Sequence, residues 1–445
     1  MVARPFQGAT FKVLGIALLA LLMLIPLAQV NDLIGEREGR ARVATQSIAE
    51  RWGAQQLIGA PVLVVPVRRQ VLRAKDDAKP SQKEWVTIEE REYLLADRVS
   101  IGGKLAPELR RYGIYDAAVY TAELTLEGRF SAADITALTA AGAEPQWQRA
   151  ELRLPIADVR GIRRISALHF GDRELVFGPD ADGVAMVGAV TAPVQIDPAA
   201  LGETIPFSLT LTLAGTERFA ALPLARETDL HVTSPWPDPG FDGAFLPATR
   251  RVGATGFEAE WQVLDLNRRF AQHWRESESP GALAASGFGI TLAQPAGAYQ
   301  QNVRAGKYGV LFIALTFVAF FLFEVLRRLR VHPVQYLLVG LALCTFYVVL
   351  LALSEQIGFG LAYALAAAAV VAMVGGYAAV VLATRRAGIV LGALLTLIYA
   401  VLYGLVISED YALLMGSLAL LVAIAALMYL TRRVDWYTLT TAPAK

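Results

Sequence analysis

The sequence predicts an α-helical membrane protein, a six-helix bundle, with a large β-rich α+β domain outside the membrane. Composition is the first reason, because 55% of the 445 residues are hydrophobic and only 18% are charged, which is too apolar for an ordinary soluble protein. The second reason is that the apolar residues gather in six nearly uncharged runs, each long enough to cross a hydrocarbon core of roughly 30 Å. These runs cover residues 13–30, 308–326, 334–353, 357–382, 388–407 and 411–430.

The first run follows two cations, Arg4 and Lys12, as a secretory signal peptide does. Its exit, residues 26–32, offers no convincing small-x-small cleavage site, so we expect an uncleaved anchor. The chain then divides into a short stub with the first helix at residues 1–30, a water-soluble domain at 31–305, a five-helix bundle at 306–433 and a tail at 434–445.

Cations near the helix ends predict the orientation, since Lys and Arg resist translocation and stay on the cytoplasmic side. They alternate along the chain with turns that carry only acids. The cationic ends hold Arg4, Lys12, Arg327, Arg328, Arg330, Arg385, Arg386, Arg432 and Arg433, and the acidic turns hold Glu355, Glu409 and Asp410. Arg304 and Lys307 depart from this pattern, but three arginines across the same helix outweigh them. We therefore expect both termini in the cytoplasm and residues 31–305 on the outer side.

The outer domain is mildly acidic. Outside residues 31–305 the chain has 11 basic and 5 acidic residues, which leaves 30 of the 41 basic and 35 of the 40 acidic residues within them. This balance argues against a nucleic-acid partner. The single cysteine, Cys344, lies in the third apolar run, so the outer domain has no disulfide and must be stabilised by its core.

Hydrophobic periodicity predicts the secondary structure of the outer domain. Residues 32–52 suit a helix that continues from the membrane and stops at Gly53, and strict alternation at 120–127 and 207–213 is typical of half-buried strands. Further strands are expected at 61–67, 85–88, 152–154, 175–177, 184–190 and 229–232, and short helices after the Ser131-x-x-Asp134 capping box and at 264–274. The domain is thus mostly β, and two sandwich-like halves are one arrangement that fits.

The sequence contains no recognisable catalytic, cofactor or metal motif. The four histidines, His169, His231, His273 and His332, are scattered, and none stands in His-Glu-x-x-His spacing. Phosphate-binding Gly-x-x-x-x-Gly-Lys loops and Gly-x-Ser-x-Gly elbows are also missing. We therefore expect no cofactor. Carboxylates that meet only through folding leave no motif in the sequence, so an enzyme in the outer domain stays an alternative.

Small residues in two membrane runs predict close helix packing. Ala368, Ala372 and Gly376 recur every four residues, and Gly388 and Gly392 repeat the same spacing in the next run. This spacing gives a helix a flat face along which another backbone approaches closely. Alanine-rich segments also produce such spacing by chance, so the interpretation as packing seams needs the structure.

Three acids mark the membrane edges. They are Glu324, Glu355 and Glu409. Glu324 stands three and four residues before Arg327 and Arg328, the spacing of an ion pair along one helix. Ser354-Glu355 and Ser408-Glu409 end successive hairpins, which fits either a weak internal duplication or the capping of turns.

The stretch 234–247 is the densest run of unusual residues in the outer domain. Its prolines and glycines fix turns and its aromatics need cover, so we expect an ordered loop and not a flexible linker. The candidate residues are Trp236, Pro237, Pro239, Phe241 and Phe245. They form either a surface for a partner or a structural element that closes the β core, and both interpretations stay open.

Three motifs in this order resemble the CreD family of cell envelope integrity proteins: the loop at 234–247, the segment 314–324 and the segment 332–341. The match continues through 350–359, with weaker similarities at 113–115, 158–162 and 431–437, and it is loosest at 70–110 and 135–200. The resemblance implies a bacterial inner-membrane protein of a Gram-negative-type envelope, with its outer domain in the periplasm. It also implies two-component control and effects on envelope integrity, colicin tolerance and responses to cell-wall-active antibiotics. It supplies no catalytic residues.

These observations together favour a non-enzymatic protein of envelope maintenance and stress response. Its expected partners are the lipid bilayer and an envelope protein or cell-wall component bound by the periplasmic domain. The first alternative is a transporter or flippase of a hydrophobic or lipid-like solute, because a lateral groove between helices serves such a solute without buried charges. The second is a periplasmic enzyme, which a concave site with converging carboxylates or a Ser/His pair would favour.

The alternation of arginine pairs and acidic turns predicts the outcome of reporter fusions. Fusions near residues 150, 355 and 409 are expected to report the periplasmic side, and fusions near residues 329, 385 and 440 the cytoplasmic side. Labelling of an Arg385→Cys variant by a thiol reagent confined to the periplasm would contradict this topology.

Overall fold

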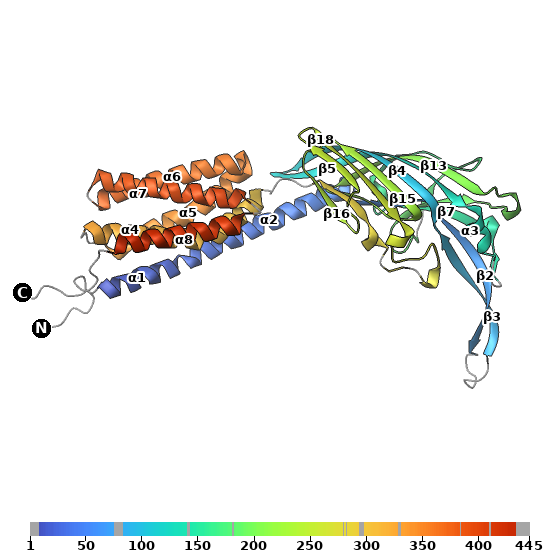
Figure 1. Cartoon of the computed structure of the whole chain (residues 1–445), viewed down its shortest axis with the longest axis horizontal. Helices are drawn as coiled ribbons and strands as arrows, with labels where there is room; N and C mark the ends of the chain where they lie inside the picture. Colours follow the sequence, from blue (N-terminus) through green and yellow to red (C-terminus); the bar gives the residue numbers. More distant parts are fainter. Residues whose placement is uncertain are drawn as a thin grey trace, which may run out of the picture. The chain divides into compact units, whose positions relative to one another are not determined.

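The computed structural model describes residues 9–74, 83–139, 143–179, 182–278, 280–281, 283–292, 298–327, 331–382, 384–408 and 411–432. It contains two compact units, which we call the helical unit, residues 1–42 with 296–445, and the β-rich unit, residues 43–295 (Figure 1). These bounds differ from the expected 31 and 305. The reason is that the joining helices continue past the apolar runs, and hydropathy detects only the runs.

Six helical segments of the described residues are long and apolar enough to cross a membrane, which confirms the six predicted spans. The first span consists of two helices in succession. The helices are α1 (Ala9–Leu22), α2 (Leu24–Trp52), α4 (Ala298–Arg327), α5 (Pro333–Ile357), α6 (Phe359–Val381), α7 (Arg385–Ile407) and α8 (Ala412–Thr431). The helix expected at 32–52 is present as the second part of α2, and Gly53 stops it at a φ of 140°, a conformation that favours glycine.

The first span breaks at Met23, three residues before Pro26. Proline has no backbone N–H and its ring crowds the preceding turn, so a helix that contains it kinks or breaks there. Met23 is buried against Gly340 of α5, where a Cβ on the glycine would lie 2.6 Å from the methionine sulfur. The Cys344 thiol, also on α5, lies 3.9 Å from the Met23 carbonyl oxygen. These contacts seat the break on α5.

An aromatic cluster lies where α5, α6 and α7 meet. The centroid of the Phe346 ring is 5.3 Å from that of Tyr363 and 4.6 Å from that of Tyr399. The Tyr363 hydroxyl donates to the Tyr399 carbonyl oxygen at 2.7 Å, which joins α6 to α7. In contrast, no described residue of α8 is buried.

Glycines close the contact between α6 and α7. A Cβ on Gly388 would lie 2.6 Å from the Gly375 carbonyl oxygen, so the two backbones touch here. Gly392 has more room, since the nearest atom to its Cβ position is Val371 Cγ1 at 3.9 Å. The other predicted set, Ala368, Ala372 and Gly376, lies on an exposed face of α6. The buried face carries Ala362, Ala366, Val370, Val374 and Ala378 at the same spacing. Spacing alone therefore does not identify the packed face of an alanine-rich helix.

The described strands of the β-rich unit form three sheets. The nine-stranded sheet runs β10 (Arg173–Leu175), β9 (Leu168–Phe170), β13 (Thr204–Thr216), β5 (Tyr115–Ser131), β4 (Ala96–Tyr112), β15 (Ala225–Ser234), β18 (Gly256–Leu264), β17 (Thr249–Gly253), with β8 (Ile162–Ile165) also on β13. The seven-stranded sheet runs β11 (Gly178–Pro179), β12 (Ala189–Val194), β7 (Ala150–Pro155), β2 (Val62–Ala74), β3 (Lys83–Leu94), β19 (His273–Arg275), with β6 (Ala143–Pro145) on β2. The four-stranded sheet runs β1 (Gln56–Ile58), β14 (Arg218–Ala221), β20 (Phe288–Leu292), β16 (Pro239–Gly243). Most of their buried side chains form one continuous core, not two sandwich-like halves, and a small second cluster holds Ala117 and Val119 of β5.

Most predicted strands are present. The period-two segments at 120–127 and 207–213 lie within β5 and β13. Of the other predicted strands, those at 85–88, 152–154 and 229–232 lie within β3, β7 and β15, and 61–67 overlaps β2 from Val62 on. The segments at 175–177 and 184–190 are strands only in part. Val184 and Val187 instead close a tight turn around Ala185 and Met186, whose φ values of 46° and 70° are incompatible with a strand.

One of the two predicted short helices is present. Helix α3 (Ala132–Ala137) follows Ser131, although that side chain makes no capping hydrogen bond. The prediction of a helix at 264–274 is wrong. The Asn267 side chain accepts from the Leu264 N–H at 3.1 Å and fixes a turn, after which β19 pairs with β3. This pairing stacks Trp274 on Tyr93 at 5.6 Å, so a tertiary contact overrides the local helical pattern.

Gly388→Leu is expected to force α6 and α7 apart, because a side chain at this position has no space beside Gly375. The expected loss is about 1 to 3 kcal/mol of unfolding free energy, the range for overpacked cores. Thermal unfolding in detergent micelles measures it. Gly376→Leu, on the exposed face of α6, is the matched control and should leave the midpoint unchanged. Equal thermal unfolding midpoints for the two variants would contradict close packing of α6 and α7 at Gly388.

Candidate binding site on the open sheet face

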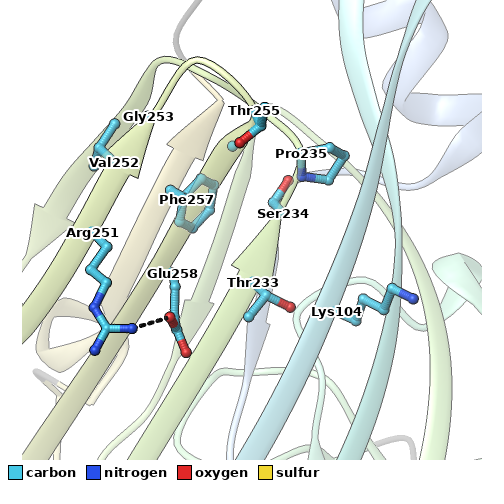
Figure 2. Close-up of a pocket in the computed structure, with 11 residues that line it drawn as sticks. Lys104, Thr233, Ser234, Pro235, Arg251, Val252, Gly253, Thr255, Phe257 and Glu258 are labelled. Atoms are coloured by element: carbon cyan, nitrogen blue, oxygen red, sulfur yellow. Dashed lines mark hydrogen bonds and ion pairs between the residues drawn. The ribbon is translucent and has the colours of Figure 1, made fainter.

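A cavity of about 520 Å³ lies at one end of the nine-stranded sheet (Figure 2). Strand β18 alternates, with Phe257 facing the core and Glu258 facing the open side of the sheet. Strand register then places Thr233 of β15 beside Glu258, and Lys104 of β4 beside Thr233. Arg251 of β17 completes this part of the lining. The site is thus built by side chains from four neighbouring strands that share one face.

Gly256 shapes the end of the cavity. Its φ is 131°, and a Cβ here would overlap the Ser234 carbonyl oxygen and lie 2.6 Å from Pro235 Cα. The β17–β18 hairpin therefore lies very close to the start of the predicted loop at 234–247. Only glycine at position 256 allows this approach, because any other residue would add a Cβ there. Ser234 and Pro235 also line the cavity, so the predicted loop begins at the candidate site.

The cavity presents both signs of charge. Arg251 pairs with Glu258 at 3.3 Å between Nη1 and Oε2, and His231 Nε2 lies 3.1 Å from the other oxygen of Glu258. Lys104 lies on β4 on the opposite side, with Thr233 between it and Glu258, and its ammonium group points away from Thr233 (Figure 2). Two cations and a hydroxyl on one sheet face, with β15 and β18 between the strands of Lys104 and Arg251, suit the binding of an acidic or zwitterionic group through charge-assisted hydrogen bonds.

Three side chains on this face have the chemistry of metal ligands. The ligand atoms of His231, Glu258 and Glu260 all lie within 4.8 Å of one another. However, Glu258 is already paired with Arg251, and Glu260 accepts from the Thr249 hydroxyl at 2.9 Å. A metal would have to displace both contacts, so we assign none. Sequence reasoning missed this group because His231 and Glu258 are 27 residues apart and meet only through strand register.

The predicted loop residues Phe241 and Phe245 face the core. Phe241, on β16, meets Phe257 edge to face at a centroid distance of 6.0 Å. Phe245 meets Phe288 at 5.7 Å, and its carbonyl oxygen accepts from the Trp261 indole at 3.2 Å. These contacts tie the loop to the core beneath the sheet.

Trp236 is half-buried and follows directly after the residues that line the cavity. Its indole N–H donates to the Asp238 carbonyl oxygen at 3.2 Å, and its backbone N–H donates to the Ser234 hydroxyl at 3.3 Å. Pro237 is exposed, and Pro239 is half-buried and opens β16. Trp236 is therefore positioned by local hydrogen bonds and keeps part of its ring surface accessible.

Glu324 is buried in the helical unit, with 2% of its surface exposed. It accepts from the Tyr336 hydroxyl and from the Val331 N–H, both at 2.8 Å. The carboxylate thus joins the end of α4 to the start of α5. The side chain of Arg327 and all of Arg328, its predicted partners, lie outside the described residues, so the predicted ion pair stays a prediction.

Glu355 belongs to a polar cluster of α2, α4 and α5 in the helical unit. It accepts from the Tyr299 hydroxyl at 2.9 Å and lies 3.8 Å from the Arg37 guanidinium. Beside it in sequence, the Ser354 hydroxyl accepts from the Asn302 amide at 2.9 Å, and both residues are buried. These contacts give Ser354-Glu355 a role in helix packing. Glu409, the third predicted edge charge, lies outside the described residues.

A carboxylate and a histidine meet in the seven-stranded sheet. Glu92, 3% exposed, lies 2.6 Å from His273 Nε2 and 2.7 Å from Arg69 Nη2. Burial favours the neutral acid, but the hydrogen bond from His273 and the charges of His273, Arg69 and Arg275 hold the pKa of Glu92 below its ordinary value. The same hydrogen bond, opposed by burial, raises the pKa of His273. The pair is not part of the cavity lining.

The fold and the site define a multi-pass membrane protein that carries a large β-rich unit with a solvent-facing cavity. A family profile described as Inner membrane protein CreD matches residues 8–437. The chain is 33% identical over 427 residues to Inner membrane protein CreD of Escherichia coli strain K12, which covers 96% of this chain and 93% of the relative. The chain therefore belongs to the CreD family of inner membrane proteins, and the resemblance read from its motifs is confirmed.

The Glu92–His273 pair predicts a maximum in the pH dependence of stability. A histidine whose pKa rises on folding stabilises fully below its ordinary value of 6.5, and this contribution is lost as pH rises through the folded pKa. A carboxyl group whose pKa falls on folding stabilises fully above its ordinary value of 4.5, and this contribution is lost as pH falls through the folded pKa. The pair therefore contributes most between these two values.

His273→Gln should flatten this part of the pH profile, measured as the unfolding midpoint of the β-rich unit in the full-length protein. The matched control is His169→Gln, at an exposed position on β9, which should keep the parent profile. A parent-like profile in His273→Gln would refute the role given to the pair.

Proposed function

We propose that this inner membrane protein serves envelope maintenance and stress response without catalysing a reaction, and that its β-rich unit binds an envelope protein or cell-wall component in the periplasm. Membership of the CreD family supports the envelope role, through the properties that the resemblance implies. The observation that carries the binding step is the cavity between Lys104 and Arg251 at the end of the nine-stranded sheet.

The geometry suits an acidic group of the partner. Lys104 and Arg251 stand on separate strands of one sheet, so the backbone positions that carry them are set before a partner arrives. The Arg251 side chain is 89% exposed and its ion pair with Glu258 is solvated. Arg251 can therefore leave Glu258 and pair with a carboxylate or phosphate of the partner at little cost in free energy. The half-buried Trp236 at the start of the adjoining loop adds an aromatic surface of the kind that anchors interfaces.

Helix α2 is the element that would relay binding to the membrane, because it runs without interruption from Leu24 to Trp52. The Trp52 ring lies 3.6 Å from the Arg110 guanidinium and 4.6 Å from that of Arg163, measured to the ring centroid. Its indole N–H donates to the Tyr120 carbonyl oxygen at 3.3 Å. Directly after the helix, Asp158 accepts from the Ala54 N–H at 2.9 Å. These contacts attach the end of α2 to the β-rich unit.

A carrier of a hydrophobic or lipid-like solute is the second candidate. An apolar groove between α1 and α4 of the helical unit favours it, since a lateral opening to hydrocarbon is what such a solute needs. The enzyme alternative has less support, because the Glu92–His273 pair lies outside both described cavities.

The double variant Lys104→Glu with Arg251→Glu tests the binding site. Both side chains are exposed, so the protein should accumulate and unfold like the parent. Reversal of both charges removes two charge-assisted hydrogen bonds, each worth about 1.5 to 3 kcal/mol, and should abolish binding. In cells that lack the parent gene, we expect the variant to fail to restore growth on a cell-wall-active antibiotic. Full restoration at parent abundance would refute the site.

The matched control is Arg164→Glu, an exposed arginine on β8 of the same sheet, which should restore growth.

Trp236→Ala then separates the two interpretations of the loop. Parent abundance with lost growth assigns Trp236 to the binding surface. A joint fall in abundance and protease resistance assigns it to closure of the core.

A further inference from the structure

Strand β17 lies at one end of the nine-stranded sheet, and among the described strands it pairs with β18 alone. All five of its residues, Thr249–Gly253, are exposed. Three of them, Arg251, Val252 and Gly253, also line the candidate cavity. The open edge of the sheet and the cavity therefore adjoin and share these residues.

Strand register shows which backbone groups of β17 point to the open edge. Gly253 and Gly256 face each other across a two-residue turn, so each donates its N–H to the carbonyl oxygen of the other. Hydrogen-bonded pairs alternate along an antiparallel ladder, so the next residue of β17 that bonds to β18 is Arg251. The N–H and C=O groups of Arg250 and Val252 consequently point away from β18, and no described backbone group outside the strand pairs bonds to them.

These outward groups match the backbone of an extended peptide. Arg250 and Val252 are two residues apart, so their N–H and C=O groups repeat along the edge at about 6.8 Å. A peptide in extended conformation carries donors and acceptors at the same spacing and adds to such an edge as a further strand. Its side chains would also cover Val252, which is 51% exposed at the edge.

The side chains of β17 favour an acidic peptide. Arg250 and Arg251 are adjacent in the strand, so they lie on opposite faces, and an added strand meets one arginine on each face. Arg251 ends a row of neighbouring side chains on the open face, which runs Lys104, Thr233, Glu258, Arg251. An acidic side chain of the added strand would extend this row beside Arg251. Opposite charges on neighbouring strands stabilise their pairing, whereas like charges destabilise it.

We propose that β17 is a docking edge for an extended, acidic segment of an envelope protein, which adds to the nine-stranded sheet as a further strand. The inference rests on the proposed function and narrows its partner to a protein segment. Backbone hydrogen bonds of Arg250 and Val252 hold the segment, and the two arginines select its charge. The same arginines disfavour pairing with β17 of a second copy, because such a pair would bring cations of the two chains together.

Val252→Pro removes one outward N–H and should prevent strand addition. Proline is tolerated on an edge strand where the missing N–H faces solvent, so the variant should reach parent abundance. Val252→Ala, which keeps the N–H and shortens the side chain, is the matched control. In cells that lack the parent gene, the alanine variant should restore growth on a cell-wall-active antibiotic and the proline variant should not.

Restoration of growth by Val252→Pro at parent abundance would refute strand addition. If Lys104→Glu with Arg251→Glu still fails in the same cells, the cavity remains the binding site and only the mode of binding is wrong. Restoration by the charge-reversed variant would refute the proposed function itself. The two failures are therefore distinguishable.

Hydrogen–deuterium exchange of the full-length protein in detergent micelles tests the pairing directly. The probe is a short synthetic peptide of alternating Glu and Thr, which at millimolar concentration should slow amide exchange in the fragment that contains residues 249–253. Two control peptides carry Lys in place of Glu or an N-methylated backbone. Each should need a concentration at least about fivefold higher for the same protection, the factor expected for the loss of one hydrogen bond. Equal protection by either control, or no protection by the Glu–Thr peptide, would overturn the proposal.

A disulfide test examines pairing between two copies. In a Cys344→Ser background, Val252→Cys should form disulfides between chains no faster than Arg164→Cys, at an exposed position on β8. Copper phenanthroline is the oxidant, and the full-length protein is held in vesicles. Faster formation from Val252→Cys would show that a second copy occupies the edge, which would overturn the proposal.

Discussion

Hydrocarbon offers no partner to an unpaired backbone N–H or C=O, and this constraint determines the form of the helical unit. Every described span is a helix, and the first span breaks at Met23, where Pro26 lacks the backbone N–H that would continue the helical hydrogen bonds. The break at Met23 lies against Gly340 and Cys344 of α5, so protein atoms cover it. Other buried polar groups of the helical unit are paired with protein atoms, as Asn302 with Ser354 and Glu324 with Tyr336 show.

In the β-rich unit, strand register determines which side chains lie together on one face of a sheet. A shift of one residue between β15 and β18 would turn Thr233 and Glu258 to opposite faces and dissolve the candidate site. Register is held by the buried partners of these residues, since Val232 and Phe257 must stay in the core. Packing on the core face of the sheet therefore determines which polar side chains meet on its open face. This dependence also explains why charged and hydroxyl side chains that are far apart in sequence, such as Lys104, Thr233 and Glu258, meet in the lining of the cavity.

Features that follow from local pattern were predictable, and features that depend on pairing were not. Apolar length revealed the spans, and alternation revealed β5 and β13, because each signal lies within one element. The helix expected at 264–274 failed because Trp274 stacks on Tyr93, far away in sequence. For the same reason the groups around Glu258 and Glu92 could not be foreseen. The alanines of α6 present the same spacing on two faces, so the sequence could not identify the face that packs on Gly388.

The one thiol of the chain, Cys344, is buried beside the break of the first span, and no cysteine lies in the β-rich unit. Maturation of this protein consequently requires no disulfide exchange, and the slow reshuffling of mispaired bridges cannot limit its folding rate. Reductants and oxidants that reach the β-rich unit find no sulfur pair to convert, so its stability is indifferent to the redox poise of its compartment. A unit without disulfides keeps its covalent framework under reducing conditions that open the bridges of disulfide-dependent neighbours.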